Sequence, residues 1–494
     1  MVAEIFVSFA LAYLAYYIIT TIVIRRNMPP GPFPYPLIGN IPHLSCDPIN
    51  PYSKLADEYG DIFSLTFPTG ETIVVLNSAK LAREARLGKQ ENLSGRSPGS
   101  LYPFPEIFGN DIMTADYSPE MRFRRRVFKA AMHVFGAGIE EVSERAGHAV
   151  DISIKEIDSH EGKPFSPRKI LESSIIIQIW DWLTTEKFQS NNPTVKKLSL
   201  FNALCTKQVL HSSFYQMIPF ISHLPLQITR DLNTAKQIRN AVFSVEYESH
   251  KKTYTPGVIR DLTDSFINCY EKEIAKETKN SIGSVDDVAG LMADVIFAGS
   301  DTASSSLAWF LLYMVLYPEI QAKIHEELDV VVGKKRTPCW NDARNMPFLQ
   351  ATLCEVQRAS GMIGVVGTNA IRDMQIAGYH IPKGTFVALN LAKLHHDERE
   401  WPEPEKFNPG RFLDSDGKFV GWSKLNGFLP FSVGRRDCPG QSLAKIMMFT
   451  FSSMLLHRYK IELPAEAETP TTEITEAAII RRPKDYKIIA KQRN

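Results

Sequence analysis

The residues with the clearest chemical potential lie in one ten-residue segment, Phe431-Ser-Val-Gly-Arg-Arg-Asp-Cys-Pro-Gly440. The pattern after it predicts an apolar-faced helix over residues 441–457. Pro439 suits the first turn of that helix, which puts Cys438 just before a helix N-terminus. The helix dipole, free backbone donors and the two neighbouring arginines favour a thiolate there. We predict that Cys438 is an anionic sulfur ligand of a metal cofactor. An inert core cysteine, the usual alternative, has no use for two adjacent arginines.

An acid and an alcohol stand at adjacent positions, Asp301 and Thr302, inside a long apolar stretch. Residues 288–317 read as a buried helix that begins after a capping-box-like run at 284–287 and ends at Pro318. A carboxylate next to a hydroxyl can relay protons from solvent to a reacting group. The alternative is purely structural, with both groups bonded to backbone carbonyls one turn back. From these residues alone, both interpretations stay open.

The surroundings of this pair form a polar island, Ala298-Gly-Ser-Asp-Thr-Ala-Ser-Ser-Ser306. Serine and threonine hydroxyls compete for backbone acceptors, and Gly299 thins the helix. We therefore expect a local groove beside Asp301 and Thr302, and we count Gly299 with the catalytic candidates.

Glu355 and Arg358 form a further pair, because residues three apart fall on one helical face. Most such pairs lie in solvent and contribute only about 0.2–0.5 kcal/mol. The apolar context here predicts instead a buried ion pair that needs further partners.

These residues must be positioned by a large folded chain. Of its 494 residues, 44% are hydrophobic and 22% charged, which excludes a disordered or disulfide-stapled protein. The net charge of +1 gives no electrostatic reason to expect nucleic acid as a partner. The six cysteines form no CxxC pair, which indicates reduced thiols rather than a disulfide framework or a zinc site. Neither GxGxxG nor GxxxxGK(S/T) occurs, so reducing electrons would come from another protein.

Residues 5–24 contain no charge and are just long enough to span a hydrocarbon core of about 30 Å as a helix. We interpret them as a transmembrane anchor. A cleaved secretory signal is the alternative, but its apolar part would be about 7–15 residues long and a small-x-small site would follow it. Arg25 and Arg26 flank the inner end, so the positive-inside bias predicts a cytosolic globular part.

The globular part reads as mainly helical, with short β-like runs at residues 62–67 and 72–76. No internal repeat or Gly/Ser-rich linker follows residue 40. We predict a membrane anchor at residues 1–26 and a stiff proline-rich hinge at 27–40. A single mainly α domain with small β-sheets would follow at 41–494.

Together these segments resemble the cytochrome P450 family of haem-thiolate monooxygenases over nearly the whole chain. The motif order agrees: an anchor and hinge, Ala298-Gly-x-Asp-Thr302, Glu355-x-x-Arg358, then Phe407-Asn-Pro-Gly-Arg-Phe412. The likeness is greatest to the microsomal animal branch that includes steroid 17-alpha-hydroxylases and aromatic-hydrocarbon hydroxylases. The FxxGxRxCxG signature, expected by chance in roughly one chain in 10⁴, is matched at Phe431, Gly434, Arg436, Cys438 and Gly440.

The resemblance implies the cytochrome P450 fold and a role for each matched residue. Cys438 would be the axial ligand of the iron of haem b, inside a cofactor-binding loop that includes Arg436. Glu355, Arg358 and Arg411 would form a buried structural cluster. The substrate pocket would be walled by mostly apolar residues, which predicts a lipophilic substrate: Phe108, Phe297, Ala298, Val365, Val366 and the turn near Ala477 and Ala478.

Two departures concern the haem. The family usually has a tryptophan four residues before an arginine, where this chain has Met121 before Arg125, so only Arg125 remains to contact a haem propionate. The family's Pro-His pair appears as Gly367-Thr368. Both changes predict an unusual haem seat.

Two further departures concern the backbone. Gly410 replaces a glutamate that the family usually has, and Gly361 stands where a proline generally follows the Glu355 helix. The pocket wall over residues 362–366 is therefore expected to differ in shape.

The resemblance implies a monooxygenase that inserts one oxygen atom of O₂ into a steroid-like or aromatic substrate. Asp301 and Thr302 would supply protons, and NADPH would act only indirectly, through a reductase. Two rivals stay open: a haem-thiolate isomerase or dehydratase of lipid peroxides, and a non-catalytic membrane haem-binding protein. The retained Asp301–Thr302 pair counts against the isomerase.

A basic run, Arg122, Arg124, Arg125, Arg126 and Lys129, places several cations on one helical face. Its ordinary interpretation is a solvated charged face. We expect instead that Arg125 turns inward to the haem and that others dock an acidic electron donor. The donor would be the reductase, with a b-type cytochrome as a second candidate, on a chain anchored in the endoplasmic reticulum membrane.

Overall fold

The computed structural model describes residues 2–44, 51–88, 91–96, 103–137, 139–217, 221–276, 283–474 and 480–493. The chain divides into two compact units. The sheet unit comprises Met1–Ser97, Ile363–Pro404 and Leu425–Asp437, and the helical unit comprises Pro98–Met362, Glu405–Lys424 and Cys438–Asn494. Each unit is described by itself.

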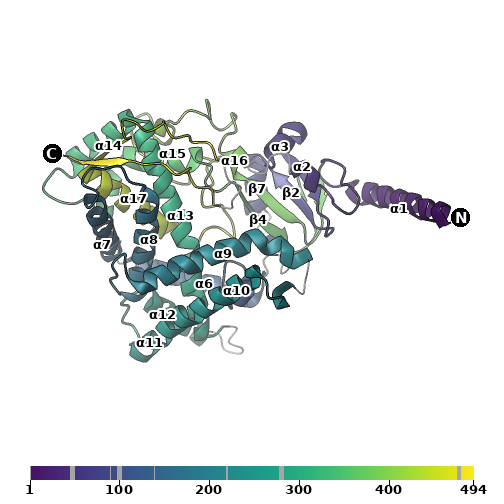
Figure 1. Cartoon of the computed structure of the whole chain (residues 1–494), viewed down its shortest axis with the longest axis horizontal. Helices are drawn as coiled ribbons and strands as arrows, with labels where there is room; N and C mark the ends of the chain where they lie inside the picture. Colours follow the sequence, from purple (N-terminus) through teal and green to yellow (C-terminus); the bar gives the residue numbers. More distant parts are fainter. Residues whose placement is uncertain are drawn as a thin grey trace. The chain divides into compact units, whose positions relative to one another are not determined.

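The sheet unit is built on a five-stranded mixed sheet (Figure 1). Its strands follow the order β1 (Ile62–Thr66), β2 (Thr72–Leu76), β7 (Phe386–Asn390), β4 (Val365–Ala370), β3 (Leu93–Gly95). The pair β2–β7 is parallel and the other pairs are antiparallel. The two β-like runs expected from the sequence are thus confirmed as β1 and β2. Shorter elements complete the unit: α2 (Ile41–Leu44), α3 (Ser53–Tyr59), α4 (Ala79–Arg83), the π-helix η1 (Glu84–Gly88), the hairpin β5 (Met374–Ile376) and β6 (Tyr379–Ile381), and α16 (Leu391–Leu394).

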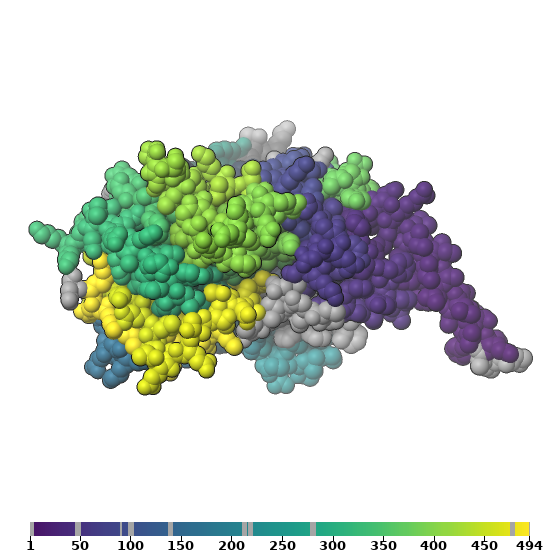
Figure 2. Space-filling model, turned by 90° about the horizontal axis from the view of Figure 1, so that it is seen from above, coloured from purple at the N-terminus to yellow at the C-terminus, as the bar shows by residue number. Residues whose placement is uncertain are grey.

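The first helix, α1 (Val2–Arg25), exposes nearly all of its apolar side chains, which form the purple end in Figure 2. Its last residue is tied to the rest of the unit, because Arg25 Nη1 donates to the Pro32 carbonyl at 2.5 Å. Ser64 on β1 donates from its backbone N to Pro30 at 2.7 Å and from Oγ to Pro29 at 2.6 Å. Pro29, Pro30 and Pro32 of the proline-rich segment are therefore bonded to β1 and to the end of α1.

The helical unit consists mainly of packed α-helices, which confirms the expected fold class. Its helices are α5 (Phe104–Phe108), α6 (Pro119–Ala137), α7 (Ile139–Asp158), α8 (Pro167–Thr184), α9 (Pro193–Met217), α10 (Gln227–Arg239), α11 (Val245–Thr253), α12 (Leu262–Lys276), α13 (Val288–Leu316), α14 (Pro318–Val331), α15 (Pro347–Ala359) and α17 (Gln441–Arg458). The hairpin of β8 (Tyr459–Glu462) and β9 (Ile489–Gln492) joins them. Short 3₁₀ or π turns connect several: η2 (Ile221–His223), η3 (Asn240–Ser244), η4 (Val285–Asp287), η5 (Trp340–Asn345) and η6 (Pro409–Phe412).

The long helix α13 is the central element of the helical unit and packs against α8. It begins as the sequence predicts, because Ser284 caps the preceding turn η4 in a capping box with Asp287. Both α1 and the helix over Val285–Leu316 are long and apolar enough to cross a membrane, but the most apolar part of the second is 72% buried inside the protein. The second is therefore a core helix, and of these two helices in the described part of the chain α1 is the one that fits an anchor.

His250 on α11 makes two contacts with carboxylates whose strength depends on pH. Its Nε2 lies 2.9 Å from Asp261 Oδ2, and its Nδ1 lies 3.0 Å from Glu246 Oε1. Burial lowers the pKa of His250, but the hydrogen bonds to Asp261 and Glu246 outweigh it and raise the pKa to about 10. A base whose pKa is higher in the folded state stabilises the fold most below its unfolded pKa of about 6.5.

We predict that this contribution is lost as pH rises from about 6.5 to 10. The thermal midpoint of the purified protein should fall over that pH window, and the midpoint of the His250→Gln variant should fall by less. The exposed His223→Gln should keep the wild-type profile. Identical profiles for His250→Gln and wild type would contradict the assignment.

Candidate active site

Cys438 lies three residues before the first residue of α17, at its N-terminal end. The N-cap is Gly440, so Pro439 precedes the cap and does not occupy the first helical turn as expected. The thiol is half-buried and takes part in no disulfide. Among the described cysteines, Cys205, Cys269 and Cys354 are buried, and burial raises the pKa of each of these thiols. Cys438 is thus set apart from these core thiols.

A lysine on α17 belongs to the same neighbourhood. Burial lowers the pKa of Lys445, and the nearby thiols Cys354 and Cys438 act in the opposite direction. A cation beside a thiol favours the thiolate. Lys445 follows Cys438 by seven residues, and the sequence interpretation overlooked it because it considered only the arginines before the cysteine.

The part of the cysteine loop up to and including Asp437 belongs to the sheet unit. Gly434 has φ +87°, and a Cβ there would lie 2.4 Å from the Arg86 carbonyl oxygen, so both conformation and space require glycine. Arg435 pairs with Glu91 at 2.5 Å, and Arg436 Nε donates to the Ser94 carbonyl at 2.8 Å. Phe431 is half-buried in the same loop, as is Gly440 in the segment that continues into α17.

Glu355 and Arg358 form a fully buried, two-bonded ion pair on α15. Arg358 Nε donates to Glu355 Oε2 at 2.7 Å, and Nη2 donates to Oε1 at 2.8 Å. Arg411 Nε lies 3.5 Å from Glu355 Oε1, and the Asn408 backbone N donates to the same oxygen at 2.8 Å. The structure therefore brings Glu355, Arg358 and Arg411 together and ties α15 to the segment around η6.

The two backbone departures have distinct physical reasons. Gly361 follows α15 with φ +54°, a conformation closed to proline, whose ring fixes φ near −65°. At Gly410, the backbone N donates to the side chain of Asn408 at 2.9 Å, and a Cβ would lie 2.9 Å from that oxygen. Asn408 thus caps η6 without an acidic residue.

Asp301 is buried on α13 and faces a polar cavity of about 230 Å³. Its Oδ2 accepts hydrogen bonds from Arg482 Nη2 at 2.8 Å and from Thr206 Oγ1 at 3.3 Å. Arg482 also lies 3.9 Å from Glu172, and both side chains keep about a third of their surface exposed. The cavity is lined by Glu172, Ile176, Ser199, Asn202, Ala203, Thr206, Ser300, Asp301, Ser304 and Arg482. It has room for several water molecules between solvent and Asp301.

Thr302 is half-buried, and its hydroxyl donates to the Ala298 carbonyl at 2.8 Å. Ala298 is exposed one turn earlier on the same face, whereas most of α13 is buried. The cavity beside Asp301 matches the expected groove, but Gly299 does not line it, and a Cβ at Gly299 would lie 2.9 Å from Ile179 of α8. Gly299 thus allows α8 and α13 to approach closely. Ala298 and Thr302 are the more exposed residues on this part of α13, and we call them its open strip.

A buried acid pair, which the sequence interpretation also missed, lies two turns before Asp301. The Ile112 backbone N donates to Asp294 Oδ2 at 2.9 Å, and burial raises the pKa of Asp294, with repulsion from Asp111 adding to it. Arg124 donates to the Asp111 carbonyl at 2.9 Å and is buried, so this member of the basic run is a core residue.

The predicted pocket residues fall in different places. Phe108 of α5 is fully buried, and its ring lies 5.5 Å from that of Phe297 on α13, next to Ala298. Val365 and Val366 are half-buried at the start of β4 in the sheet unit. Residues 477 and 478 lie outside the described part of the chain.

On α6, Met121 is buried and Arg125 is half-buried one turn later. Arg122, Arg126 and Lys129 are exposed on one helical face. Arg126 is partly engaged, since its Nε lies 2.5 Å from Glu273 of α12.

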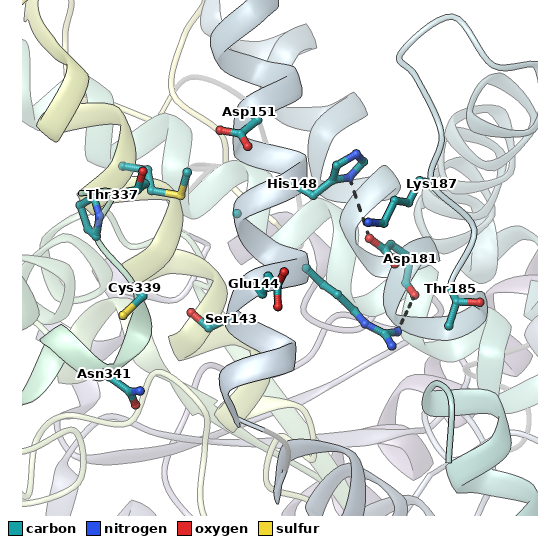
Figure 3. A pocket seen from close by; sticks show the side chains of 14 residues that line it. Ser143, Glu144, His148, Asp151, Asp181, Thr185, Lys187, Thr337, Cys339 and Asn341 are labelled. Atoms are coloured by element: carbon teal, nitrogen blue, oxygen red, sulfur yellow. Dashed lines mark hydrogen bonds and ion pairs between the residues drawn. The ribbon is translucent and has the colours of Figure 1, made fainter. Parts of the chain in front are cut away.

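A larger cavity of about 810 Å³ opens beside α7 and contains none of the predicted site residues (Figure 3). His148 Nδ1 and Asp181 Oδ2 face each other there at 3.9 Å, with Glu144 and Lys187 nearby. Its lining contains both acidic and basic side chains, so it is a polar cleft rather than the apolar pocket expected for a lipophilic substrate.

Comparisons with known proteins agree with this arrangement. A family model described as Cytochrome P450 matches residues 29–490. The chain is 31% identical to the steroid 17-alpha-hydroxylase/17,20 lyase of Squalus acanthias, over 93% of this chain and 91% of the relative. It is 32% identical to cytochrome P450 2D4 of Rattus norvegicus, over 94% and 93%. A solved structure of a zebra fish cytochrome P450 with progesterone superposes with a TM-score of 0.77 at 27% identity, covering 92% of this chain and 99% of that one. The chain belongs to the cytochrome P450 family, and it is an oxidoreductase that incorporates molecular oxygen with haem iron.

Proposed function

We propose that this protein is a membrane-anchored monooxygenase that inserts one oxygen atom of O₂ into a lipophilic, steroid-like substrate. Its electrons come from NADPH through a reductase. The observation that carries the proposal is Asp301, a buried carboxylate that lines a polar cavity and directly precedes the half-buried Thr302 on α13.

The donor set fits the family's haem. Cys438 offers a sulfur outside any disulfide, next to a helix N-terminus and to the ammonium group of Lys445. Cys438 would bind the iron, and Arg436 and Arg125 would hold the carboxylates of haem b. When bound, a haem with a thiolate ligand supplies the cleavage of dioxygen and the transfer of one oxygen atom.

The chain's own contribution is to move protons. Water in the cavity of about 230 Å³ can exchange protons with Asp301, because Arg482 and Glu172 at its rim are partly exposed. Arg482 holds the Asp301 carboxylate in place. The Thr302 hydroxyl, on the neighbouring open strip, is oriented by its bond to Ala298. Asp301 therefore acts as the proton carrier and Thr302 as the hydroxyl that passes the proton on.

A steroid-like substrate is favoured by two findings. Relatives similar to this chain are named steroid 17-alpha-hydroxylases, and a similar solved structure holds progesterone. The face of α13 at Phe297 and Ala298 is apolar and adjoins the aromatic side chains of α5. A flat, largely apolar molecule matches such a surface.

The electron donor is proposed to dock on the exposed cations of α6, Arg122, Arg126 and Lys129. An acidic reductase, or a b-type cytochrome, would be steered there by charge, so its reduction rate should fall as salt screens the attraction. The apolar, exposed helix α1 is proposed to be a single-pass anchor in the endoplasmic reticulum membrane. Recovery of the intact chain in the soluble fraction of cells would contradict that anchor.

The test is turnover with purified reductase, NADPH and a panel of steroids. Asp301→Asn should slow oxygenation about 100-fold, since a positioned proton donor typically contributes at least that much. Thr302→Ala should keep haem, substrate binding and much of the NADPH consumption but divert electrons into hydrogen peroxide. Asp294→Asn is the matched control, because it removes a carboxylate from the same face of α13 outside the cavity.

Two rivals make different predictions in this assay. A lipid-peroxide isomerase would turn over without reductase and would not respond to either change, and a non-catalytic haem protein would consume no NADPH. Unchanged coupling in Thr302→Ala, together with reductase-independent turnover, would overturn the proposal.

A further inference from the structure

Arg86 of η1 is a buried arginine without an acidic partner. It is 3% exposed, and no carboxylate of the described residues lies within ion-pair distance of it. Its Nη1 donates to Thr368 Oγ1 at 2.8 Å, and its Nε has no hydrogen-bond partner among the described atoms. A buried cation is normally paired, because an unpaired one loses its hydration without compensation.

Two other arginines lie at the same edge of the sheet. Arg96 Nη1 donates to the Gly367 carbonyl at 2.6 Å, next to Thr368 on β4. Arg436 Nε donates to the carbonyl of Ser94 on β3, the strand that pairs with β4. The Arg86 backbone is in turn packed against Gly434 of the cysteine loop. The guanidinium groups of Arg86, Arg96 and Arg436 are therefore held by backbone or hydroxyl oxygens of β3 and β4, at one edge of the sheet.

The electrostatics make this arrangement costly without an anion. Burial lowers the pKa of Arg86 to about 9, and the positive charge of Arg96 adds to the effect. A bound carboxylate would offset the effects of burial and of the Arg96 charge on the pKa of Arg86. A guanidinium group can hold a carboxylate through two parallel hydrogen bonds.

Thr368 orients the guanidinium group of Arg86. Its hydroxyl donates to the Leu93 carbonyl at 3.2 Å, so it accepts from Arg86 and fixes the guanidinium at the edge of β4. A Cβ at Gly367 beside it would lie 2.1 Å from the ring of Phe386, so a larger residue there would have to displace that ring. The Gly367-Thr368 pair, which differs from the Pro-His pair of the family, is thus built into a contact with Arg86.

We infer that Arg86 binds a carboxylate of the haem, together with Arg96 and Arg436, at the edge of the sheet where Gly367-Thr368 replaces the family's Pro-His pair. The inference rests on the proposed haem site and names a further residue of that site. Arg86 is the binding group, and Thr368 is a positioning residue.

The experiment measures haem loss from the full-length protein in detergent to an excess of apomyoglobin, at fixed salt and pH. Arg86→Leu should lose haem about tenfold faster than wild type, since a charge-assisted hydrogen bond is removed. Thr368→Val, which removes only the orienting hydroxyl, should lose it faster by a smaller factor. Arg83→Leu, one turn earlier and bonded to a backbone carbonyl, is the matched control and should behave as wild type.

A second measurement uses haem dimethyl ester, whose carboxylates are blocked. Esterification should speed haem loss from wild type by a clearly larger factor than from Arg86→Leu, because the variant has already lost that contact. Equal factors for the two proteins, or wild-type loss rates in both Arg86→Leu and Thr368→Val, would overturn the inference. If the haem-loaded wild type itself lacks the thiolate carbon monoxide band, the proposed function fails instead.

Discussion

Cys438→Ala should abolish the long-wavelength absorption band of the reduced carbon monoxide complex. Cys438 lies next to the N-terminal end of α17, and Lys445 adds a positive charge nearby. An alanine there would remove the proposed sulfur ligand of the iron, so oxygen activation should be lost along with the band. The measurement is the difference spectrum of the purified variant, together with NADPH-dependent turnover.

The matched control for this change is Cys339→Ala. Cys339 is the other half-buried cysteine among the described ones, and it lines the polar cleft beside α7. This variant should keep both the band and the activity. A normal band in Cys438→Ala would show that the iron ligand is another residue.

Arg358→Ala should have the largest effect on stability. Arg358 and Glu355 are both completely buried and share two short hydrogen bonds. Removing the guanidinium leaves a buried carboxylate short of its main partner, which typically costs about 3–5 kcal/mol. Arg358→Lys keeps the charge but loses the two-bonded geometry, so it should fall between alanine and wild type. The measurements are the thermal midpoint and the yield of haem-loaded protein.

Arg399→Ala is the surface counterpart. Arg399 also makes two-bonded contacts, with Asp61 and Asp397, but its side chain is 60% exposed. Exposed pairs contribute about 0–1 kcal/mol, so this variant should be nearly as stable as wild type. Similar thermal midpoints for Arg358→Ala and Arg399→Ala would show that the buried ion pair contributes no more to stability than the exposed one.

The elements that carry the site follow from local patterns. The apolar run after Ser284 predicts α13, and the pattern after Gly440 predicts α17 to within one residue of its end. The contact between Glu355 and Arg358 is equally local, since one helical turn brings the two side chains together. Such features depend on neighbours in the sequence, which is why the sequence is enough to predict them.

Other contacts depend on tertiary packing and leave no local pattern. Arg482 reaches Asp301 across 181 residues, and Arg86 reaches Thr368 across 282. Neither arginine belongs to a motif with a recognisable spacing. A cavity does lie beside Asp301, as expected, but Gly299 does not line it, because whether a glycine opens space or admits a neighbour depends on α8.

The bonds between α1, the prolines and β1 make the joint at the anchor stiff. Arg25, at the end of α1, holds the Pro32 carbonyl, and Ser64 holds Pro29 and Pro30. With α1 inserted as the proposed anchor, this joint would restrict how the sheet unit can rotate above the bilayer. Much of the orientational entropy is then lost once, when the helix inserts, and not again at each encounter with a membrane-borne electron donor. This protein and its proposed electron donor would then meet by diffusion in the plane of the membrane, and this protein would already have a preferred tilt.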